Sequence, residues 1–284
     1  MSWACRAVNM PGAHAEMKRR LRASASASEF WPMIDTSGTP HLTLVVPCYN
    51  GEDRLPAALA QLSAFIAAQP YSNELILVDD CSAEPAARIL REYAAARPGI
   101  RLIRNERNLG KGKSVGRGML AGRGRFRCFP DADLAYPPEE VNKILRDLEA
   151  GADVAIACRV LPESRYLMSP NFFHYLYTRH IMSRAFNLLA RIVLLRDVLD
   201  SQAGLKGFTA AAAEAVFPRL TIPRFGFDVE ALFIAQKHHL AVRQTAVFFR
   251  YDEEPTTVKF AQSAVTMALE LLQVRLNDWR GKYV

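Results

Sequence analysis

The 284-residue sequence has few cysteines, and none of them lies in a metal-binding arrangement. Cys5, Cys48, Cys81, Cys128 and Cys158 are scattered, with no Cys-x-x-Cys pair and no histidine at zinc-ligand spacing. Structural zinc sites bring such ligands together in close pairs, and disulfide frameworks belong to small secreted domains. This scarcity argues against both classes and favours a reduced, cytosolic compartment.

Long hydrophobic runs are also missing. No stretch offers the roughly 18 uncharged apolar residues that a membrane-spanning helix needs. Residues 1–30 contain no apolar core between their charges and a cleavage site, so they do not resemble a secretory signal. Their Ala/Ser run and mixed charges indicate a flexible tail over 1–40, and we expect the fold to begin near His41.

Acidic residues are outnumbered: the chain has 29 acids against 36 lysines and arginines, a formal net charge of +7. Such a balance favours anionic partners, namely phosphorylated substrates, nucleic acid or acidic lipid. The basic residues are spread along the chain without a nucleic-acid recognition motif, which weighs against a nucleic-acid-binding module. Half of the residues are hydrophobic, as expected of a globular protein with a substantial core.

What the chain does contain is a regular alternation of short apolar runs and helical patterns. Strands are predicted over 42–46, 74–80, 100–104, 125–130 and 153–158. Between them, helices are predicted over 53–68, 84–96, 111–121 and 137–150. This alternation is typical of an α/β fold with a mostly parallel sheet and flanking helices. The second half is less regular, with a loop and short strand over 201–208, a helix over 225–239, a strand over 241–249 and an amphipathic helix over 256–279.

Polar residues stand where the predicted strands end. Tyr49 follows the first strand, Asp79 and Asp80 end the second, and Asp131 follows the fourth. In open parallel sheets, ligands bind at the carboxyl ends of the strands. We therefore expect these side chains to meet at one edge of the sheet.

The glycine-rich stretch "NLGKGKS" (108–114) resembles two phosphate-binding motifs but matches neither. A P-loop would require its first glycine at Arg107, and a dinucleotide fingerprint would require its third at Val115. Neither an NTPase nor a Rossmann pyrophosphate turn is supported. Lys111 nevertheless remains a candidate for binding a negative charge.

The stretch "FPDADLAY" (129–136) places Asp131 and Asp133 one residue apart. A surface turn is the simplest interpretation, because aspartate is a common turn residue. In extended backbone, however, residues i and i+2 point to the same side, so both carboxylates would face one cation. Mg²⁺ is often held by one or two carboxylates together with substrate phosphates. The position at the strand edge favours a nucleotide-diphosphate site that uses Mg²⁺.

Taken together, the motifs resemble those of family 2 glycosyltransferases with the GT-A fold, most closely the dolichyl-phosphate glucosyltransferase and mannosyltransferase branch. The resemblance covers roughly residues 41–260 and would make 41–255 the catalytic domain, followed by a C-terminal amphipathic helix over 256–284. It rests on the ordered motifs "VVPCYNGEDRL", "LILVDDCS", "NLGKGKSVGRGM", "PDADLAYPPEE", "ACR", "DSQAGLKGF" and "FGFDVEAL".

The resemblance implies roles for individual residues. The nucleoside pocket would be lined by Pro47, Tyr49, Asp79 and Asp80. Mg²⁺ or Mn²⁺ would be held on the donor diphosphate by Asp131 and Asp133. The basic residues implied to hold the acceptor phosphate are Arg159, Arg179, Arg250 and Lys259. Gln202 and Lys206 would lie near the sugar. The catalytic candidates are Asp133, Arg159, Gln202 and Asp228.

Three positions distinguish this chain within the family pattern. Mannosyltransferase relatives often carry glutamine at the position of Ala135, whereas glucosyltransferase relatives also have alanine there. "FDVE" (227–230) is also the glucosyltransferase-like form of its motif. Gly51 stands where relatives carry a glutamate, and Glu52 is the next residue.

Segment 166–199 is apolar and basic. No acid occurs between Ser164 and Arg196, and apolar residues recur at helical spacing. A core helix with solvated arginines and an interfacial membrane helix both fit this pattern. A lipid-linked acceptor would give the second alternative a purpose, so both stay open.

The expected function is an inverting, metal-dependent transfer of a hexose to a polyprenyl or dolichyl phosphate. The best donor candidate is UDP-glucose, with GDP-mannose second, and the expected location is the cytoplasmic face of a membrane. A phosphate acceptor is already anionic and needs arginines to orient it. A hydroxyl acceptor on a glycolipid or polysaccharide is the alternative, and it would need a carboxylate base, for which the candidates are Asp200, Asp228 and Glu230.

Overall fold

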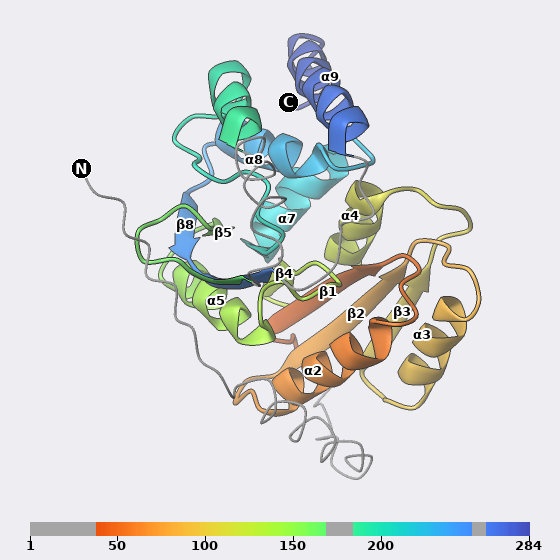
Figure 1. Ribbon diagram of the computed structural model, residues 1–284. Helices are drawn as coiled ribbons and strands as arrows, with labels where there is room; N and C mark the ends of the chain where they lie inside the picture. The colour runs from red at the N-terminus through yellow and green to blue at the C-terminus, as the bar shows by residue number, and fades with distance from the viewer. Residues whose placement is uncertain (1–37, 169–183, 252–259) are drawn as a thin grey trace. The chain divides into compact units, whose positions relative to one another are not determined.

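The computed structural model of the protein describes residues 38–168, 184–251 and 260–284. Its centre is a seven-stranded sheet with the strand order β3-β2-β1-β4-β7-β5-β8, and a two-stranded sheet pairs β6 with β9 (Figure 1). The strands are β1 (Leu42–Cys48), β2 (Asn73–Asp79), β3 (Ile100–Arg104), β4 (Phe126–Phe129), β5 (Val154–Cys158), β6 (Arg165–Met168), β7 (Lys206–Thr209), β8 (Val242–Ala246) and β9 (Phe248–Tyr251).

The large sheet is parallel except for one strand. β1 pairs in parallel with β2 on one side and with β4 on the other, and β5 pairs in parallel with β8. β7 is inserted between β4 and β5 and runs antiparallel to both. The predicted fold class, a mostly parallel sheet with flanking helices, is therefore confirmed.

Helices cover both faces of the sheet. Figure 1 shows α2, α3 and α5 on one face and α4, α7 and α8 on the other. The helices are α2 (Leu55–Ala67), α3 (Ala86–Ala95), α4 (Lys111–Ala121), α5 (Val141–Glu149), α7 (Ala210–Val216), α8 (Phe227–Lys237) and α9 (Phe260–Trp279), with a further helix over 184–193. In α2, the predicted apolar face is buried through Leu55, Leu59, Leu62 and Ile66. Each fully buried side chain of this kind stabilises the fold by about 1.5–3 kcal/mol.

α4 packs directly against the sheet at a glycine, Gly118. A Cβ atom on Gly118 would lie 2.9 Å from Val78 Cγ2 and would also overlap Val45. Only a residue without a side chain allows the helix to approach β1 and β2 this closely. This contact sets the depth of α4, whose first residue, Lys111, belongs to the candidate site.

Two sequence expectations need correction, and one helix was not predicted. The single strand predicted over 241–249 is two strands, β8 and β9, which belong to different sheets. The break is at Val247, whose N–H donates to Ser164 Oγ at 3.1 Å and whose carbonyl accepts from Arg165 N at 2.9 Å. Residues 166–168, predicted as the start of an apolar segment, belong to strand β6. The short helix α7 was not predicted.

The described part of the predicted segment 166–199 includes the helix over 184–193, and residues 169–183 lie outside the described ranges. Arg179 and Lys259, both predicted to bind phosphate, fall outside them too, as does the predicted tail up to residue 37. Within 38–168, 184–251 and 260–284, the structure contains no helix with the length and apolarity needed to cross a membrane.

Candidate active site

The polar strand ends gather as predicted. Tyr49 directly follows β1, Asp79 is the last residue of β2, and Asp131 comes two residues after β4. Since β2 and β4 both flank β1 in parallel, these three ends are neighbours at one edge of the sheet. Tyr49 is 57% exposed, which leaves its ring available to stack on a planar ligand. Pro47 is half-buried inside β1, two residues before Tyr49.

Asp79 and Asp80 are both buried, and the protein itself occupies much of their hydrogen-bonding capacity. Asp79 accepts from Ser82 N at 2.8 Å and forms an ion pair with Arg104. Asp80 accepts from Leu109 N and Gly110 N, each at 2.8 Å. These bonds attach the loop before α4 to the end of β2. A contact of either carboxylate with a nucleoside base stays a prediction.

Asn105 joins this network and was missed by the sequence analysis. It is fully buried, and its Nδ2 donates to Asp80 Oδ1 at 2.6 Å and to Ser114 Oγ at 2.9 Å. Its Oδ1 accepts a hydrogen bond from Arg117. Asn105 directly follows β3, so its place after a third neighbouring strand was the signal that could have revealed it.

The network places Lys111 in the site. Gly110, with φ at 91°, lies so close to Pro223 that a Cβ would be 2.5 Å from the Pro223 carbonyl oxygen. From the helix start fixed in this way, Lys111 Nζ lies 2.6 Å from Asp131 Oδ1 and 3.9 Å from Asp228 Oδ2. Burial opposes the charged form of Lys111, but the carboxylates of Asp131, Asp228 and Asp133 hold its pKa above the usual value.

The Asp-Ala-Asp stretch is a turn and not the extended backbone that was expected. Leu134 N donates to the Asp131 carbonyl at 3.1 Å, and Ala135 N donates to Asp133 Oδ1 at 3.1 Å. Leu134 has φ at 48° and is 2% exposed, so burial of this side chain accompanies the reversal. The assumption that the two carboxylates project from an extended strand was therefore wrong. Both nevertheless act on the Lys111 ammonium.

The loop before β7 closes over Asp131. A Cβ on Gly204 would lie 2.6 Å from Asp131 Cγ, so no side chain fits between this loop and the carboxylate. In the same loop, Gln202 Nε2 is shielded from solvent and has no hydrogen-bond partner among the described residues. Buried amide donors are normally satisfied, so this one is available for an acceptor atom of a ligand.

Lys206 and Asp228 form a buried ion pair beside this loop. Lys206 is fully buried, and its Nζ donates to Asp228 Oδ1 at 2.6 Å and to the Ala203 carbonyl at 2.5 Å. Burial lowers the pKa of Lys206, and the nearby charge of Lys111 adds to this effect, although Asp228 opposes it. The pair therefore connects β7 to the start of α8 at the base of the site.

Arg159 is held by Asp200 in a two-pronged pair. Its Nε and Nη2 donate to the two carboxylate oxygens, each at 2.7 Å, and its backbone N–H donates to Oδ2 at 2.9 Å. Burial of Asp200 favours the neutral acid, yet the Arg159 charge and hydrogen bonds hold the pKa of Asp200 below its usual value. The guanidinium of Arg159 is thus oriented before any ligand arrives.

Arg250 lies beside the Asp-Ala-Asp turn. Its backbone N–H donates to the Ala135 carbonyl at 2.7 Å, and its Nη2 approaches Gln61 Oε1 at 3.4 Å. Of the four basic residues predicted to hold an acceptor phosphate, Arg159 and Arg250 are described. The predicted roles of all four stay predictions.

The three candidate bases differ in availability. Glu230 is fully buried and accepts from Ile222 N at 2.8 Å and from Tyr283 Oη at 2.6 Å, so it anchors the loop before α8. Asp200 is paired with Arg159, and Asp228 is paired with Lys206. Each of the three carboxylates is therefore already paired with a cation or with several hydrogen-bond donors.

The site suits a divalent cation only if the substrate contributes ligands. Among the described residues, no cluster of three or more histidine, cysteine, aspartate or glutamate side chains could hold a metal ion by itself. Asp131 Oδ1 is shielded from solvent and accepts no hydrogen bond of normal geometry. It forms an ion pair with Lys111 Nζ. Asp131 and Asp133 both act on the same Lys111 ammonium, and two carboxylates so close together fit an ion that also binds a diphosphate.

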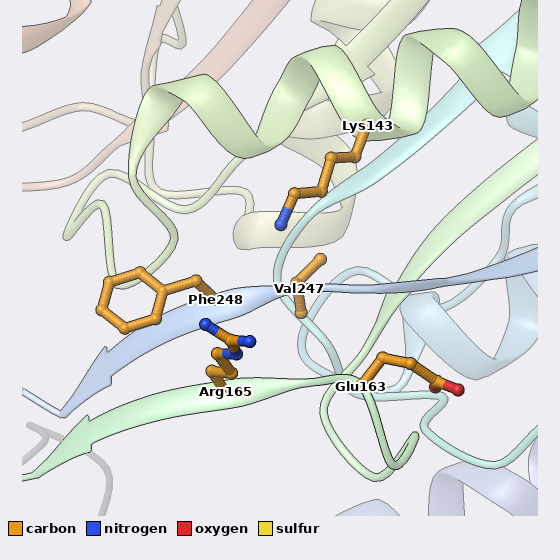
Figure 2. A pocket seen from close by; sticks show the side chains of 5 residues that line it. All are labelled: Lys143, Glu163, Arg165, Val247 and Phe248. Atoms are coloured by element: carbon orange, nitrogen blue, oxygen red, sulfur yellow. The ribbon is translucent and has the colours of Figure 1, made fainter. Parts of the chain in front are cut away.

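A separate hollow of about 380 Å³ lies between α5 and the two-stranded sheet (Figure 2). Its lining contains none of the predicted site residues and consists of Lys143, Glu163, Arg165, Val247 and Phe248. The Lys143 ammonium forms an ion pair with Glu140 at 2.7 Å. The hollow is therefore distinct from the cluster around Asp131.

Comparisons with known proteins agree with this arrangement. The family model described as Glycosyl transferase family 2 matches residues 43–215. The dolichyl-phosphate β-glucosyltransferase of Homo sapiens is 30% identical, over 98% of this chain and 88% of that protein. The enzyme of the same name from Dictyostelium discoideum is also 30% identical, over 85% of this chain and 77% of that protein.

Solved structures show the fold. Glucosyl-3-phosphoglycerate synthase from Mycobacterium tuberculosis, in complex with UDP, superposes with a TM-score of 0.61 at 18% identity, covering 94% of this chain and 86% of that one. The same enzyme with Mn²⁺, UDP-glucose and glycerol 3-phosphate gives 0.57 at 17% identity, covering 88% and 84%. The architecture is the GT-A fold, and with the family match and the carboxylate-lined edge of its sheet, this chain belongs to glycosyl transferase family 2 and is a glycosyltransferase.

Proposed function

We propose that the protein transfers glucose from UDP-glucose, with inversion, to a polyprenyl or dolichyl phosphate at the cytoplasmic face of a membrane, with Mg²⁺ or Mn²⁺ as cofactor. The names of the relatives at 30% identity support the glucosyl group and the lipid phosphate. The choice of a phosphate acceptor over a hydroxyl acceptor rests on the state of the three carboxylates that could act as a base.

Asp200, Asp228 and Glu230 are each engaged by cations or by several hydrogen-bond donors. A hydroxyl acceptor needs a free carboxylate to take its proton, whereas a phosphate monoester is already anionic near neutral pH. The site therefore supports an acceptor that needs orientation by cationic groups and no base. Arg159, held rigidly by Asp200, is the described residue best prepared for that task.

On the donor side, Asp131 and Asp133 would hold the metal, which when bound neutralises the negative charge that develops on the leaving diphosphate. Lys111 lies between these acids and Asp228 and supplies a positive charge to the same diphosphate. Gln202 offers its unpaired amide donor from the loop over Asp131. The exposed ring of Tyr49 would stack on the nucleobase.

In the reaction, the acceptor phosphate oxygen forms a bond to the anomeric carbon while the bond from that carbon to the diphosphate oxygen breaks. The electron pair of the broken bond leaves on UDP. Attack from the side opposite the diphosphate inverts the configuration at the anomeric carbon. No proton transfer from the acceptor is required, in keeping with the absence of an uncommitted carboxylate among the three candidates.

The test is a transfer assay with radiolabelled donors. The purified protein is incubated with UDP-glucose or GDP-mannose and with detergent-dispersed polyprenyl phosphate, with Mn²⁺ or with a chelator. We expect label in the organic phase only with UDP-glucose and Mn²⁺, loss of it in Asp133→Ala, and full activity in Glu92→Ala, an exposed acid on α3. Label in water-soluble glycan alone would favour a hydroxyl acceptor, and organic-phase label from GDP-mannose would change the donor.

A further inference from the structure

Large apolar side chains are exposed on two helices at one end of the described fold. On α9, Leu269 is 60% exposed and Trp279 is 75% exposed, and on the helix over 184–193, Ile192 is 75% exposed. We call the exposed apolar residues of these two helices the apolar platform, which consists of Leu188, Leu189, Ile192, Leu269, Leu272, Leu276 and Trp279. Contiguous exposed apolar surface on a soluble domain commonly marks an interaction site.

The α9 part of the platform is a continuous stripe. Its four residues follow the spacing i, i+3, i+7 and i+10, which places them on one helical face. The opposite face contacts the rest of the protein through Leu271, Val274 and Asn277, each no more than 1% exposed. α9 is therefore held in place by one face and presents a second, apolar face outward.

The helix over 184–193 has the same character. Asn187 and Ala190 are buried on its inner side, whereas Leu188 and Ile192, four residues apart, share its outer side. In an ordinary surface helix, the outer side is polar. Here the outward side carries large aliphatic residues.

The two helices are neighbours. The Arg275 guanidinium on α9 donates a hydrogen bond to the Val193 carbonyl at the end of the other helix. Figure 1 shows both helices projecting beyond α8 at the same end of the described fold. The two apolar faces thus belong to one region of the surface.

The charge around the platform is positive. Exposed basic residues on or next to the two helices are Arg184, Arg191, Arg196, Arg280 and Lys282. Two acids on α9 are engaged, since Asp278 pairs with Lys237 and Arg275, and Glu270 accepts from Gly226 N at 2.9 Å; Asp197, next to Arg196, is an exposed acid among the five basic residues. Apolar side chains within a cationic rim match the acyl boundary and headgroups of a bilayer that contains anionic lipid.

We propose that the apolar platform docks the enzyme on an anionic lipid surface. The biological purpose rests on the proposed function, since a lipid-linked acceptor must be reached at the bilayer. A second copy of the chain is the competing occupant, but a two-fold contact through the platform would bring like-charged rims together. Tryptophan is favoured at the membrane–water interface, which suits the position of Trp279 near the end of the stripe.

The first test is co-sedimentation with vesicles. We expect the wild-type protein to bind vesicles made of equal parts phosphatidylcholine and phosphatidylglycerol, and to bind pure phosphatidylcholine more weakly. Leu272→Gln with Trp279→Gln should weaken binding roughly tenfold or more, because each buried apolar side chain contributes strongly. Ile192→Gln tests the other helix. Leu120→Gln removes an exposed apolar side chain from α4 and should bind like the wild type.

Thermal unfolding of each variant shows whether it is folded, and exposed positions should leave the melting temperature unchanged. Failure of the wild type to bind anionic vesicles, or unchanged binding by the platform variants, would overturn the proposal. A wild-type dimer that becomes monomeric in these variants, with no vesicle binding, would assign the platform to a second copy of the chain.

The detergent assay separates this inference from the proposed function. The platform variants should still glucosylate detergent-dispersed polyprenyl phosphate, because the platform residues lie outside the site. Vesicle binding without glucosyl transfer would contradict the proposed function and leave the docking surface in place. Transfer in detergent without vesicle binding by the wild type would support the proposed function and contradict the docking surface.

Discussion

Lys111 Nζ lies 2.6 Å from Asp131 Oδ1, so the first residue of α4 neutralises the first acid of the Asp-Ala-Asp turn. The two residues are brought together by Asp80, which fixes the backbone at Gly110 with a 2.8 Å hydrogen bond. The carboxylate of Asp131 is also a proposed metal ligand. A divalent cation held by Asp131 would therefore compete with Lys111 for this carboxylate until a diphosphate provides a second anion.

This competition gives the first prediction. Lys111→Met should bind Mn²⁺ alone about tenfold more tightly than the wild type, because a positive charge a few ångströms from the metal position is removed. The same variant should bind UDP with Mn²⁺ more weakly, because a cation that faces the diphosphate is lost. Isothermal titration measures both affinities. Lys143→Met, remote from the site, serves as the control, and weaker binding of Mn²⁺ alone by Lys111→Met would refute the competition.

The second prediction concerns the charge of the turn. Asp133→Asn keeps an oxygen atom that can accept the 3.1 Å bond from Ala135 N, so the turn should survive. Glucosyl transfer should nevertheless fall by about 100-fold or more, because the charge that holds the metal is lost. Asp131→Asn should behave alike, and Glu92→Gln should remain active. Full activity of either turn variant at limiting Mn²⁺ would show that the substituted acid does not hold the metal.

The third prediction concerns the stability of the buried pair. Lys206→Met leaves the Asp228 carboxylate buried without its main cation, which should cost about 3–5 kcal/mol of unfolding free energy. The double variant Lys206→Met with Asp228→Leu should recover much of this loss, because the uncompensated charge is gone. Urea unfolding followed by circular dichroism measures both. Equal stability of the single and double variants would show that the pair is not a coupled unit.

The fourth prediction is a pH dependence at Arg159 and Asp200. The pKa of Asp200 is lowered in the folded state, so its contribution to stability is present above the ordinary value of 3.8 and is lost as pH falls through the folded value. Arg159→Gln removes the charge that outweighs burial, so the pKa of Asp200 should rise. The variant should therefore be less stable than the wild type at neutral pH, and the difference should shrink in acid.

Urea unfolding at a series of pH values measures this effect. Arg91→Gln is the matched control, because Arg91 pairs with Glu84 where both side chains are more than half exposed. Exposed pairs contribute little, so the control should follow the wild type at every pH. A constant difference between Arg159→Gln and the wild type across the acid range would contradict the assignment.

The edge of the sheet could be predicted because it follows from local pattern. Apolar runs that end in Tyr49, Asp79 and Asp131, separated by helical stretches, indicate parallel strands whose ends meet. The same pattern could not reveal the shape of the Asp-Ala-Asp stretch. Its reversal accompanies the burial of Leu134 against the rest of the fold, and burial depends on neighbours that are distant in the sequence.

The pairing within the site was equally hidden. Lys206 and Asp228 meet because β7 is inserted antiparallel between β4 and β5 and brings the lysine to the start of α8. The strand predicted over 241–249 divides at Val247 because its first part, β8, pairs with β5 and its second part, β9, pairs with β6 in another sheet. Local propensity predicts neither the buried pair nor the division of the strand, since both depend on pairing between strands that are distant in the sequence.

The amino-acid sequence alone determined the class of the fold, the family and the set of polar residues at the strand ends, because periodicity and ordered motifs are local properties of the chain. The tertiary structure decided which charges are compensated and which are available. It also decided that α9 buries one of its faces and exposes an apolar one, because burial is settled only when distant segments pack together.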